Sequence, residues 1–355
     1  MTAAPLRLRL DGAALVRNWR TLAAMSGAAA CGAAVKADGY GLGATAVATR
    51  LAAAGCRDFF VATWAEAEQL APLGLPVSVL HGVRPEDMPV ATTGIARPVL
   101  NSAAQVARWQ QAGGAPCDVM VDTGMNRLGV AVEEVEAGLL DGLVIETLMS
   151  HLASADEESP MNAVQRARLA GLEGRTSARR LSLANSAGIA LGAEYLFDLT
   201  RPGLALYGGV PRGEFAGLIS QVATPEAQVL QRRRVRAGET IGYNAIYRAP
   251  ADIEVAILNI GYADGYWRGF SARGTAHAAG HPLPVLGRVS MDLVAVGADS
   301  LPSLAEGDWV TLDYALPRAA ACSGLSQYEL LTGLGARLDR RWMSSPSEPD
   351  VDGPD

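Results

Sequence analysis

Lysine is almost absent from this sequence of 355 residues, because Lys36 is the only lysine among 30 basic residues and all the others are arginine. Arginine keeps its charge under ordinary conditions, whereas lysine can lose its proton. A single lysine in such a background suggests a site that needs a neutral amine. The alternative is chance within a chain that uses arginine for every other positive charge. Composition favours neither interpretation, so the residues around Lys36 must decide.

Cysteines are few and scattered, at Cys31, Cys56, Cys117 and Cys322. They form neither a Cys-x-x-Cys pair nor the spacing of metal ligands, so we expect no metal site. Small buried side chains in a reducing compartment fit this pattern better.

Targeting and membrane segments are also missing. Arg7 and Arg9 interrupt any apolar core of a signal peptide, and no uncharged apolar run is long enough to span a bilayer. The net charge of -7 argues against a basic face for nucleic acid. The arginine-rich run at 232–236 is the one local exception, and we expect it to be a solvated edge. The sequence therefore predicts a soluble cytoplasmic protein that binds neither membranes nor nucleic acid.

Short apolar runs alternate with Ala-rich helical segments over the first two-thirds of the chain. The eight candidate strands are Cys31–Lys36, Asp58–Ala62, Pro76–His81, Arg97–Leu100, Cys117–Asp122, Leu143–Met149, Leu181–Ala184 and Tyr195–Thr200. Thr63 and Glu66 have the spacing of a capping box and predict a helix start. Such alternation predicts a parallel sheet, and the count of eight suggests a closed barrel. An open doubly wound sheet would show the same alternation.

The pattern changes near Gln228, where the helical period fades and Gly and Pro break short strand-like runs. This predicts a compact antiparallel β domain. We assign residues 1–225 to an N-terminal α/β domain and residues 226–343 to a β-strand domain. Residues 344–355 are polar and acidic, and we expect a disordered tail.

Lys36 ends an apolar run and is followed by Asp38-Gly39-Tyr40-Gly41. In a barrel, active-site groups project from the C-terminal ends of the strands. Apolar neighbours disfavour the ammonium form and lower the pKa of the amine, as Schiff-base formation with an aldehyde requires. The glycine spacing differs from the GxGxxG of dinucleotide sites. The segment therefore favours a Schiff-base lysine.

Residues 34–41 resemble the cofactor-lysine motif of the alanine racemase family. Seven further segments resemble family motifs in the same order along the chain: residues 122–129, 150–153, 185–186, 201–208, 242–244, 261–266 and 287–292. The resemblance implies a (β/α)8 TIM-type barrel followed by a mostly antiparallel β domain. It also implies pyridoxal phosphate as cofactor, an amino acid as substrate, and a homodimer in which the partner's β domain completes each site.

The resemblance implies two catalytic residues on opposite faces of the substrate α-carbon. Lys36 would hold the cofactor and act on one face, and Tyr243 of the partner subunit would act on the other. A phenol with its usual pKa near 10 is a poor base, so Tyr243 needs positive charge nearby, and His151 and Arg201 are its implied partners. Without the motif, a stacking role for Tyr243 would be the better interpretation.

The family places arginine against the cofactor's ring nitrogen, and the corresponding residue here is Arg201. A guanidinium only donates hydrogen bonds, so the nitrogen would stay unprotonated. Less of the negative charge that develops on the substrate α-carbon then spreads into the ring, which suppresses transamination. The alternative for Arg201 is a structural salt bridge beside Asp198.

The remaining implied contacts are to the phosphate, the substrate and the supporting loops. Arg127 would bind the substrate carboxylate and the cofactor's phenolic oxygen, and the Met291 backbone N–H of the partner subunit would bind the same carboxylate. The implied cofactor-binding set also contains Tyr40, Asn185, Ser186, Gly203 and Leu204, with Asp292, Tyr262 and Tyr266 in support.

Two positions depart from the family pattern. Met120 stands where many members have a carbamylated lysine that orients the substrate arginine, so we predict no carbamate, and Arg127 must be held in another way. Ala336 stands where many members have a tyrosine that narrows the site, which leaves room for serine.

Three alternatives remain open beside alanine racemisation. The first is a broader serine and alanine racemase on the same scaffold. The second is a non-catalytic homeostasis protein that binds pyridoxal phosphate with a lone barrel, against which the second domain argues. The third is a decarboxylase sharing the barrel, for which a carboxylate in place of Arg201 is expected.

Overall fold

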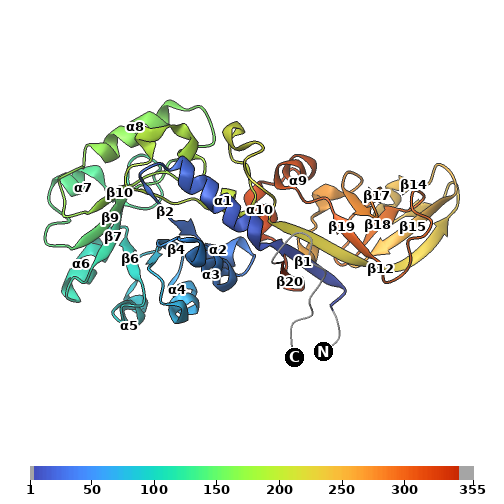
Figure 1. Ribbon diagram of the computed structural model, residues 1–355, viewed down its shortest axis with the longest axis horizontal. Helices are drawn as coiled ribbons and strands as arrows, with labels where there is room; N and C mark the ends of the chain where they lie inside the picture. Colours follow the sequence, from blue (N-terminus) through green and yellow to red (C-terminus); the bar gives the residue numbers. More distant parts are fainter. Residues whose placement is uncertain (1–3, 344–355) are drawn as a thin grey trace. The chain divides into compact units, whose positions relative to one another are not determined.

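The computed structural model describes residues 4–343 (Figure 1). Their contacts divide the chain into two units, one formed by residues 15–220 and the other by residues 4–14 together with 221–343. We call the first the barrel unit and the second the β unit, and describe each by itself. The tail predicted at 344–355 lies outside the described residues.

Parallel strands form a closed ring in the barrel unit. They are β2 (Ala30–Cys31) with β3 (Ala33–Ala34), β4 (Phe59–Val61), β5 (Val77–Val79), β6 (Arg97–Leu100), β7 (Cys117–Asp122), β9 (Ile145–Met149), β10 (Arg180–Ser182) and β11 (Leu199–Thr200). The sheet runs from β3 to β10 in chain order, and β11 pairs with β2. Backbone bonds from Asp198 N to Leu181 O (3.1 Å) and from Arg201 N to Ala184 O (2.8 Å) join β10 to β11. The predicted eight-stranded barrel is therefore confirmed, and the open sheet is excluded.

Every predicted barrel strand overlaps an observed one, although β2 shares only Cys31 with its predicted range and β10 begins one residue earlier than predicted. The short β8 (Val130–Ala131) is additional and pairs only with β7. Lys36 was placed in the first strand, but it is the first residue of α2 (Lys36–Tyr40). The strand stops at Ala34 because the backbone turns immediately afterwards.

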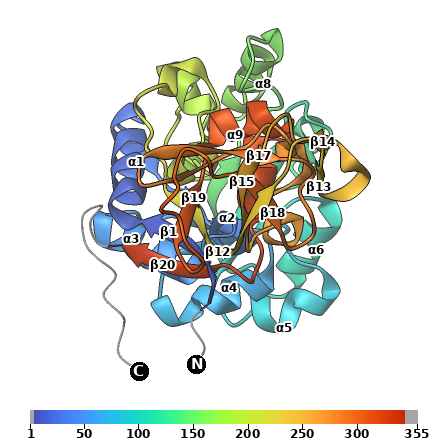
Figure 2. The same cartoon turned by 90° about the vertical axis from the view of Figure 1, so that its right-hand side faces the viewer.

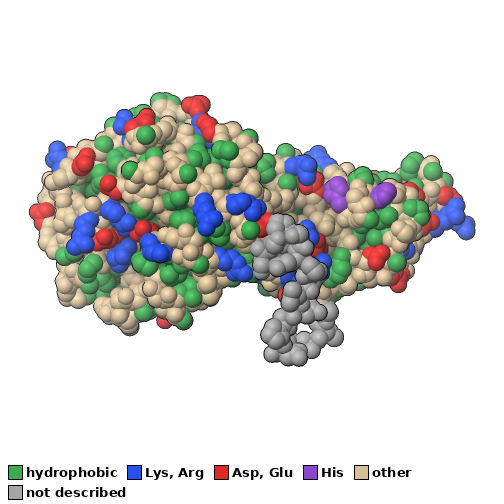
Figure 3. All heavy atoms as spheres, viewed as in Figure 1, with side chains coloured by type: hydrophobic (Ala, Val, Ile, Leu, Met, Phe, Trp, Pro, Cys, Tyr) green, Lys and Arg blue, Asp and Glu red, His purple; other side chains and the backbone are tan. Residues whose placement is uncertain are grey.

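Helices surround the parallel strands in Figure 1. They are α3 (Ala44–Ala54), α4 (Trp64–Leu70), α5 (Met88–Ala91), α6 (Ala103–Gln111), α7 (Val132–Glu136) and α8 (Pro160–Ala170). The predicted capping box begins α4, since Thr63 Oγ1 accepts from Glu66 N and Glu66 Oε2 accepts from Thr63 N. On the face shown in Figure 3, several of the basic side chains of this unit lie beside acidic ones.

The β unit is built on one mixed sheet. Its strands are β1 (Leu6–Asp11), β12 (Ala223–Val235), β15 (Ile253–Leu258), β16 (Thr275–Ala278), β17 (His281–Leu286), β18 (Val294–Gly297), β19 (Trp309–Leu312) and β20 (Asp339–Met343). All pairs are antiparallel except β1 with β20, so the expected antiparallel character is confirmed. In Figure 2, β12, β15 and β18 lie close together, as their pairing requires. The unit also contains the hairpin β13 (Thr240–Ile241) with β14 (Tyr247–Arg248), and the helices α9 (Leu316–Ser323) and α10 (Gln327–Thr332).

Strand β1 lies in a different unit from the one that the sequence suggested. Residues 1–225 were assigned to one domain, yet β1 pairs with β12 and β20 of the β unit. Leu6, Leu8 and Leu10 are buried on one face of β1, whereas Arg7 binds Glu226 of β12 at 2.6 Å. The pairing partners are more than 200 residues away, so local sequence does not reveal them. Helix α1 (Gly12–Met25) follows β1 directly.

No helix within residues 4–343 combines the length and the apolar character needed to cross a bilayer.

Candidate active site

Lys36 lies two residues beyond β3, at the C-terminal end of a barrel strand. Its side chain is partly buried. Burial lowers the pKa of the Lys36 amine, and the positive charges of Arg127 and Arg201 lower it further, while Glu66 opposes the shift. A neutral amine is therefore easier to form here than on an exposed lysine.

The backbone after Lys36 forms a left-handed turn. Ala37, Asp38, Gly39 and Tyr40 all have positive φ, between 52° and 61°. This conformation costs about 1–2 kcal/mol for each residue that carries a Cβ. Two carboxylates hold it, because Glu66 Oε1 accepts from Ala37 N at 2.7 Å and Asp38 Oδ1 accepts from Ala44 N at 2.8 Å. Sequence reasoning assigned Glu66 only to a helix cap, and missed this second role.

Tyr40, Ser186 and Gly203 come together beside this turn. A Cβ on Gly203 would lie 2.2 Å from the Tyr40 hydroxyl, so only glycine allows the observed approach. Buried Ser186 Oγ accepts from Gly203 N at 2.9 Å and from Ala205 N at 3.2 Å. The Tyr40 ring stacks on Tyr207, with 4.6 Å between centroids. The predicted phosphate residues are thus neighbours.

Tyr207 is a support that sequence reasoning did not single out. Its hydroxyl donates to Ala34 O at 2.8 Å, which links the Tyr40 ring to the strand that precedes Lys36. Leu204 is buried and begins the short helix η5 (Leu204–Tyr207). The Asn185 side chain accepts from Gly188 N at 2.9 Å, so it fixes its own turn.

Arg201 follows β11 and is 6% exposed. One terminal nitrogen donates to Ser182 Oγ, and the other donates to Ser150 O at 2.6 Å. Burial lowers the pKa of the guanidinium to about 10, and Asp118 opposes the shift. Arg201 is therefore fixed by two bonds and is still charged at neutral pH. The suggested salt bridge with Asp198 is not among the contacts of the described residues.

His151 follows Ser150 at the end of β9. Burial lowers its pKa to about 3, and the charges of Arg201, Arg127 and Lys36 contribute to the shift. The imidazole is therefore neutral at neutral pH. A neutral imidazole leaves Arg201 as the positively charged member of the pair expected beside a catalytic tyrosine.

Arg127 belongs to the loop that follows β7. Asp122 Oδ1 accepts from Gly124 N, Met125 N and Asn126 N at 2.8, 2.9 and 3.1 Å, which folds the loop around one carboxylate oxygen. The Arg127 side chain is exposed, yet its charge lowers the pKa of both Lys36 and His151, so it lies near them. Met120 is buried in β7.

Tyr243 and Met291 are both exposed residues of the β unit. Tyr243 is 65% exposed and Met291 is 53% exposed. Tyr243 begins the short helix η7 (Tyr243–Ala245) at the tip of the hairpin, where Gly242 and Asn244 have positive φ. Neither side chain is used to fill the core of its own unit.

Three loops of the β unit are bonded around Met291. Tyr262 N donates to Ser290 O and Ala263 N donates to Met291 O, both at 3.0 Å. Arg337 donates to Asp292 Oδ1 at 2.8 Å and to both carboxylate oxygens of Asp264 at 2.7 and 2.9 Å. Asp292 is thus bonded to an arginine that sequence reasoning did not identify, and its predicted role in positioning the Met291 loop stays a prediction.

The two supporting tyrosines differ in their surroundings. Tyr262 lies under the Arg268 guanidinium, 4.9 Å from the ring centroid. Tyr266 is 1% exposed and stacks on Phe270 with 4.4 Å between centroids. Tyr266 therefore supports the loop from the core of the β unit and does not reach a surface.

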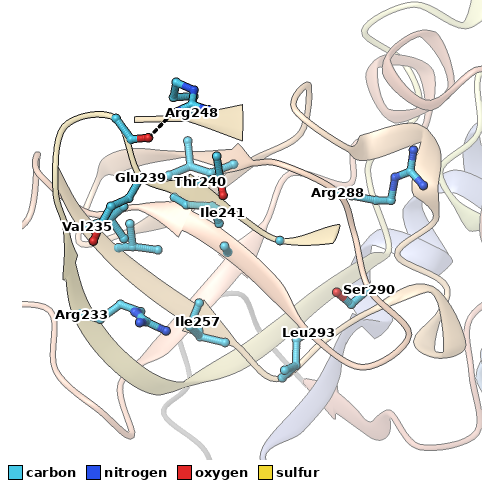
Figure 4. Close-up of a pocket in the computed structure, with 15 residues that line it drawn as sticks. Arg233, Val235, Glu239, Thr240, Ile241, Arg248, Ile257, Arg288, Ser290 and Leu293 are labelled. Carbon is cyan, nitrogen blue, oxygen red and sulfur yellow. Dashed lines mark hydrogen bonds between the residues drawn. The ribbon is translucent and has the colours of Figure 1, made fainter. Parts of the chain in front are cut away.

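A pocket of about 680 Å³ lies in the β unit, between the hairpin and the sheet (Figure 4). Apolar Val235, Ile241 and Ile257 line it together with Arg233 and Arg288. None of the residues predicted for the site lines it. Among residues 4–343, no group of three His, Cys, Asp or Glu side chains could hold a metal ion.

Comparison with known proteins identifies the scaffold. The alanine racemase N-terminal domain matches residues 10–211, and the alanine racemase C-terminal domain matches residues 222–342. The chain belongs to the alanine racemase family. Its resemblance to this family, inferred from eight motifs, is thereby confirmed.

Full-length relatives carry the same family name. The chain is 42% identical to an alanine racemase of Acidiphilium cryptum, over 94% of this chain and 97% of the relative. It is 37% identical to a biosynthetic alanine racemase of Agrobacterium fabrum, over 96% and 94%. The solved alanine racemase of Bartonella henselae, with covalently bound pyridoxal phosphate, has a TM-score of 0.88 and 36% identity, covering 96% of this chain and all of that one.

Proposed function

We propose that this protein interconverts L-alanine and D-alanine, with pyridoxal phosphate bound covalently to Lys36. The observation that supports this most directly is a lone lysine with a lowered pKa at a strand end, beside the charges of Arg127 and Arg201. Membership of the alanine racemase family over both domains supports the same reaction.

The residues beside Lys36 fit this cofactor. Gly203 leaves the space that a Cβ would fill against the Tyr40 hydroxyl, and the Ser186 hydroxyl lies on the same backbone segment. Hydroxyl and backbone N–H groups are suited to bind a phosphate dianion. Tyr40, Ser186, Gly203 and Leu204 would therefore hold the phosphate, and Asn185 and His151 would border the ring.

When bound, pyridoxal phosphate withdraws electrons from an attached amino acid and weakens its Cα–H bond. The Lys36 amine would then serve as the base or acid that takes or returns the α-proton on one face of the substrate. Burial beside two arginines favours the neutral amine that can accept this proton. Arg127 binds the substrate carboxylate as an exposed cation close to Lys36.

Arg201 would hold the ring nitrogen as a permanent donor. Its guanidinium stays charged at neutral pH, and its position is fixed by Ser182 and Ser150. A guanidinium has no acceptor, so it would donate a hydrogen bond to the lone pair of the unprotonated ring nitrogen and could not pair with a protonated one. Such an arginine would favour racemisation over transamination, because an unprotonated ring draws less negative charge away from the substrate α-carbon.

The second proton is exchanged by Tyr243 of the partner subunit. A second acid–base group on the opposite face is needed, because one base tends to return the proton to the side from which it came. The exposure of Tyr243 and of Met291 supports this arrangement, since both side chains are available to another molecule. The working form would then be a homodimer with shared sites, in which the Met291 N–H binds the substrate carboxylate.

A broader specificity for alanine and serine is the second candidate. Ala336 is exposed and lacks the ring that many family members place there. We propose that the extra space admits the serine hydroxymethyl group, and side-by-side rates for the two amino acids test this. We also propose a biosynthetic role in the cytoplasm, supplying D-alanine for peptidoglycan, which growth of a D-alanine auxotroph carrying this gene tests.

Because Lys36 is the only lysine, labelling of a lysine side chain by the cofactor can be assigned to one position. Borohydride reduction of purified protein should attach one cofactor mass to the peptide that contains Lys36, because the chain has no other lysine side chain. L-alanine in deuterated water should yield D-alanine labelled at the α-carbon. Lys36→Arg should abolish both results and leave the protein folded. Release of carbon dioxide would indicate a decarboxylase, and cofactor binding without α-exchange would indicate a homeostasis protein.

A further inference from the structure

We infer that Gln165 is a positioning residue that holds the Arg127 loop and the His151 segment in register. The inference rests on the proposed function, in which both segments belong to the active site. Gln165 lies on α8, is fully buried, and was not singled out by sequence reasoning. It touches no reacting group, and it acts through its neighbours.

The Gln165 amide bridges two strand ends. Its nitrogen donates to His151 O at 2.9 Å and to Thr123 Oγ1 at 3.3 Å, and its oxygen accepts from Ala153 N at 2.9 Å. Thr123 directly follows Asp122 at the start of the Arg127 loop, whereas His151 and Ala153 follow β9. One side chain therefore connects the ends of β7 and β9.

The same network extends to Arg201. Thr123 Oγ1 and Ser150 Oγ are hydrogen-bonded at 2.7 Å in a buried pair, and Ser150 O accepts from Arg201 at 2.6 Å. Breaking the Gln165 bonds removes the contact of α8 with the Thr123 hydroxyl and with His151 O, next to the Ser150 carbonyl that fixes Arg201. Buried networks of this kind behave as a unit, because each unsatisfied member costs free energy.

This chain has a particular need for such support. Met120 is an apolar residue and gives Arg127 no anionic partner from β7. Instead α8 holds the loop at two points, since Arg168 also donates to Thr123 O at 2.9 Å. Asp122 folds the loop internally, and Gln165 with Arg168 fixes it to the helix.

The amide is the chemically required group at this position. It must donate twice and accept once, which neither a carboxylate nor a thioether can do. Gln165→Met keeps the length and removes all three bonds, whereas Gln165→Glu keeps the acceptor and loses both donated bonds. The two variants should therefore share one defect if the donated bonds are what position the loop.

Asn162 provides a matched control on the same helix. It is also a buried amide, and its nitrogen donates to Ser154 O at 3.0 Å and Glu157 O at 3.2 Å. These acceptors lie in the loop before α8 and not at Thr123 or His151. Asn162→Leu should cost similar stability without disturbing the Arg127 loop.

The experiment measures KM and kcat for L-alanine, the inhibition constant of propanoate, and the thermal midpoint, all on holoenzyme. Propanoate reports on carboxylate binding because it lacks the amine. Both Gln165 variants should raise KM and the propanoate constant about tenfold, with kcat within about twofold. Asn162→Leu should lower the thermal midpoint as much as the Gln165 variants do and leave KM and the propanoate inhibition constant unchanged.

The outcomes separate this inference from the proposed function. If the wild-type protein does not exchange the α-proton of alanine, the proposed function fails. If the wild type racemises alanine but the Gln165 variants match Asn162→Leu in KM and in propanoate binding, Gln165 is only a core residue and the inference is overturned.

Discussion

At the scale of single residues, the charge state of His151 links the site to the stability of the fold. Its pKa is lowered from 6.5 to about 3, chiefly by burial and then by Arg201, Arg127 and Lys36. The folded protein therefore keeps a neutral imidazole where the unfolded chain takes up a proton. Stability from this residue is complete above pH 6.5 and is lost progressively as the pH falls toward 3.

His151→Gln removes this titration. We expect the wild-type free energy of unfolding, measured by urea titration, to decrease between pH 7.5 and pH 5 by more than that of the variant. His281→Gln is the control, because His281 is exposed. Equal pH dependence in wild type and His151→Gln would show that the imidazole is protonated in the folded protein.

Gly203 is the second residue that lends itself to a direct test. A Cβ there would overlap the Tyr40 hydroxyl at 2.2 Å, whereas a Cβ on Gly213 would meet no atom within 4 Å. Gly203→Ala should therefore displace Tyr40 and weaken cofactor retention about tenfold or more. Gly213→Ala should leave it unchanged, as measured by the concentration of pyridoxal phosphate needed to restore the absorbance of the resolved enzyme.

At the scale of elements, the loops of the β unit depend on Arg337. Its guanidinium joins Asp264, which is 1% exposed, to Asp292 beside Met291. Arg337→Ala leaves a buried carboxylate without its charged partner, which should cost about 1–3 kcal/mol of unfolding free energy. Arg318→Ala removes an exposed arginine from its pair with the partly buried Asp313 and should cost less than about 1 kcal/mol. Similar losses in the two variants, measured by chemical denaturation, would contradict the role given to Arg337.

The barrel elements were predictable and the supports of the site were not. Alternating apolar runs mark all eight strands, since burial against helices demands them locally. The left-handed turn after Lys36 depends on Glu66, 30 residues away, and the Arg127 loop depends on Gln165 of α8. These contacts form only once the barrel closes, so no local period in the sequence indicates them. The motifs point to Lys36, Arg201 and Ser186 because the proposed chemistry depends on those side chains themselves.

At the scale of the whole molecule, the proposed shared site predicts complementation between inactive subunits. Lys36→Arg removes the group on one face of the substrate, and Tyr243→Phe removes the group lent by the partner. Each homodimer should be nearly inactive. Random reassociation of equal amounts should restore about one quarter of wild-type activity, because half the dimers are mixed and each has one intact site.

The control for this experiment mixes Lys36→Arg with Arg201→Ala. Both residues belong to the barrel unit, so no mixed dimer contains an intact site and no activity should return. Recovery in this control, or none in the Tyr243 mixture, would contradict sites shared between subunits.

The pairing of β1 has a consequence for synthesis on the ribosome. Strand β1 lies between β12 and β20, so its sheet needs residues 6–11 together with residues 339–343. Residues 15–220 form a compact unit of their own, which can close while translation continues. The edge of β1 that pairs with β20 then stays unpaired until residues 339–343 have been synthesised. A truncated chain that stops before β20 would expose one edge of β1, and such edges favour aggregation.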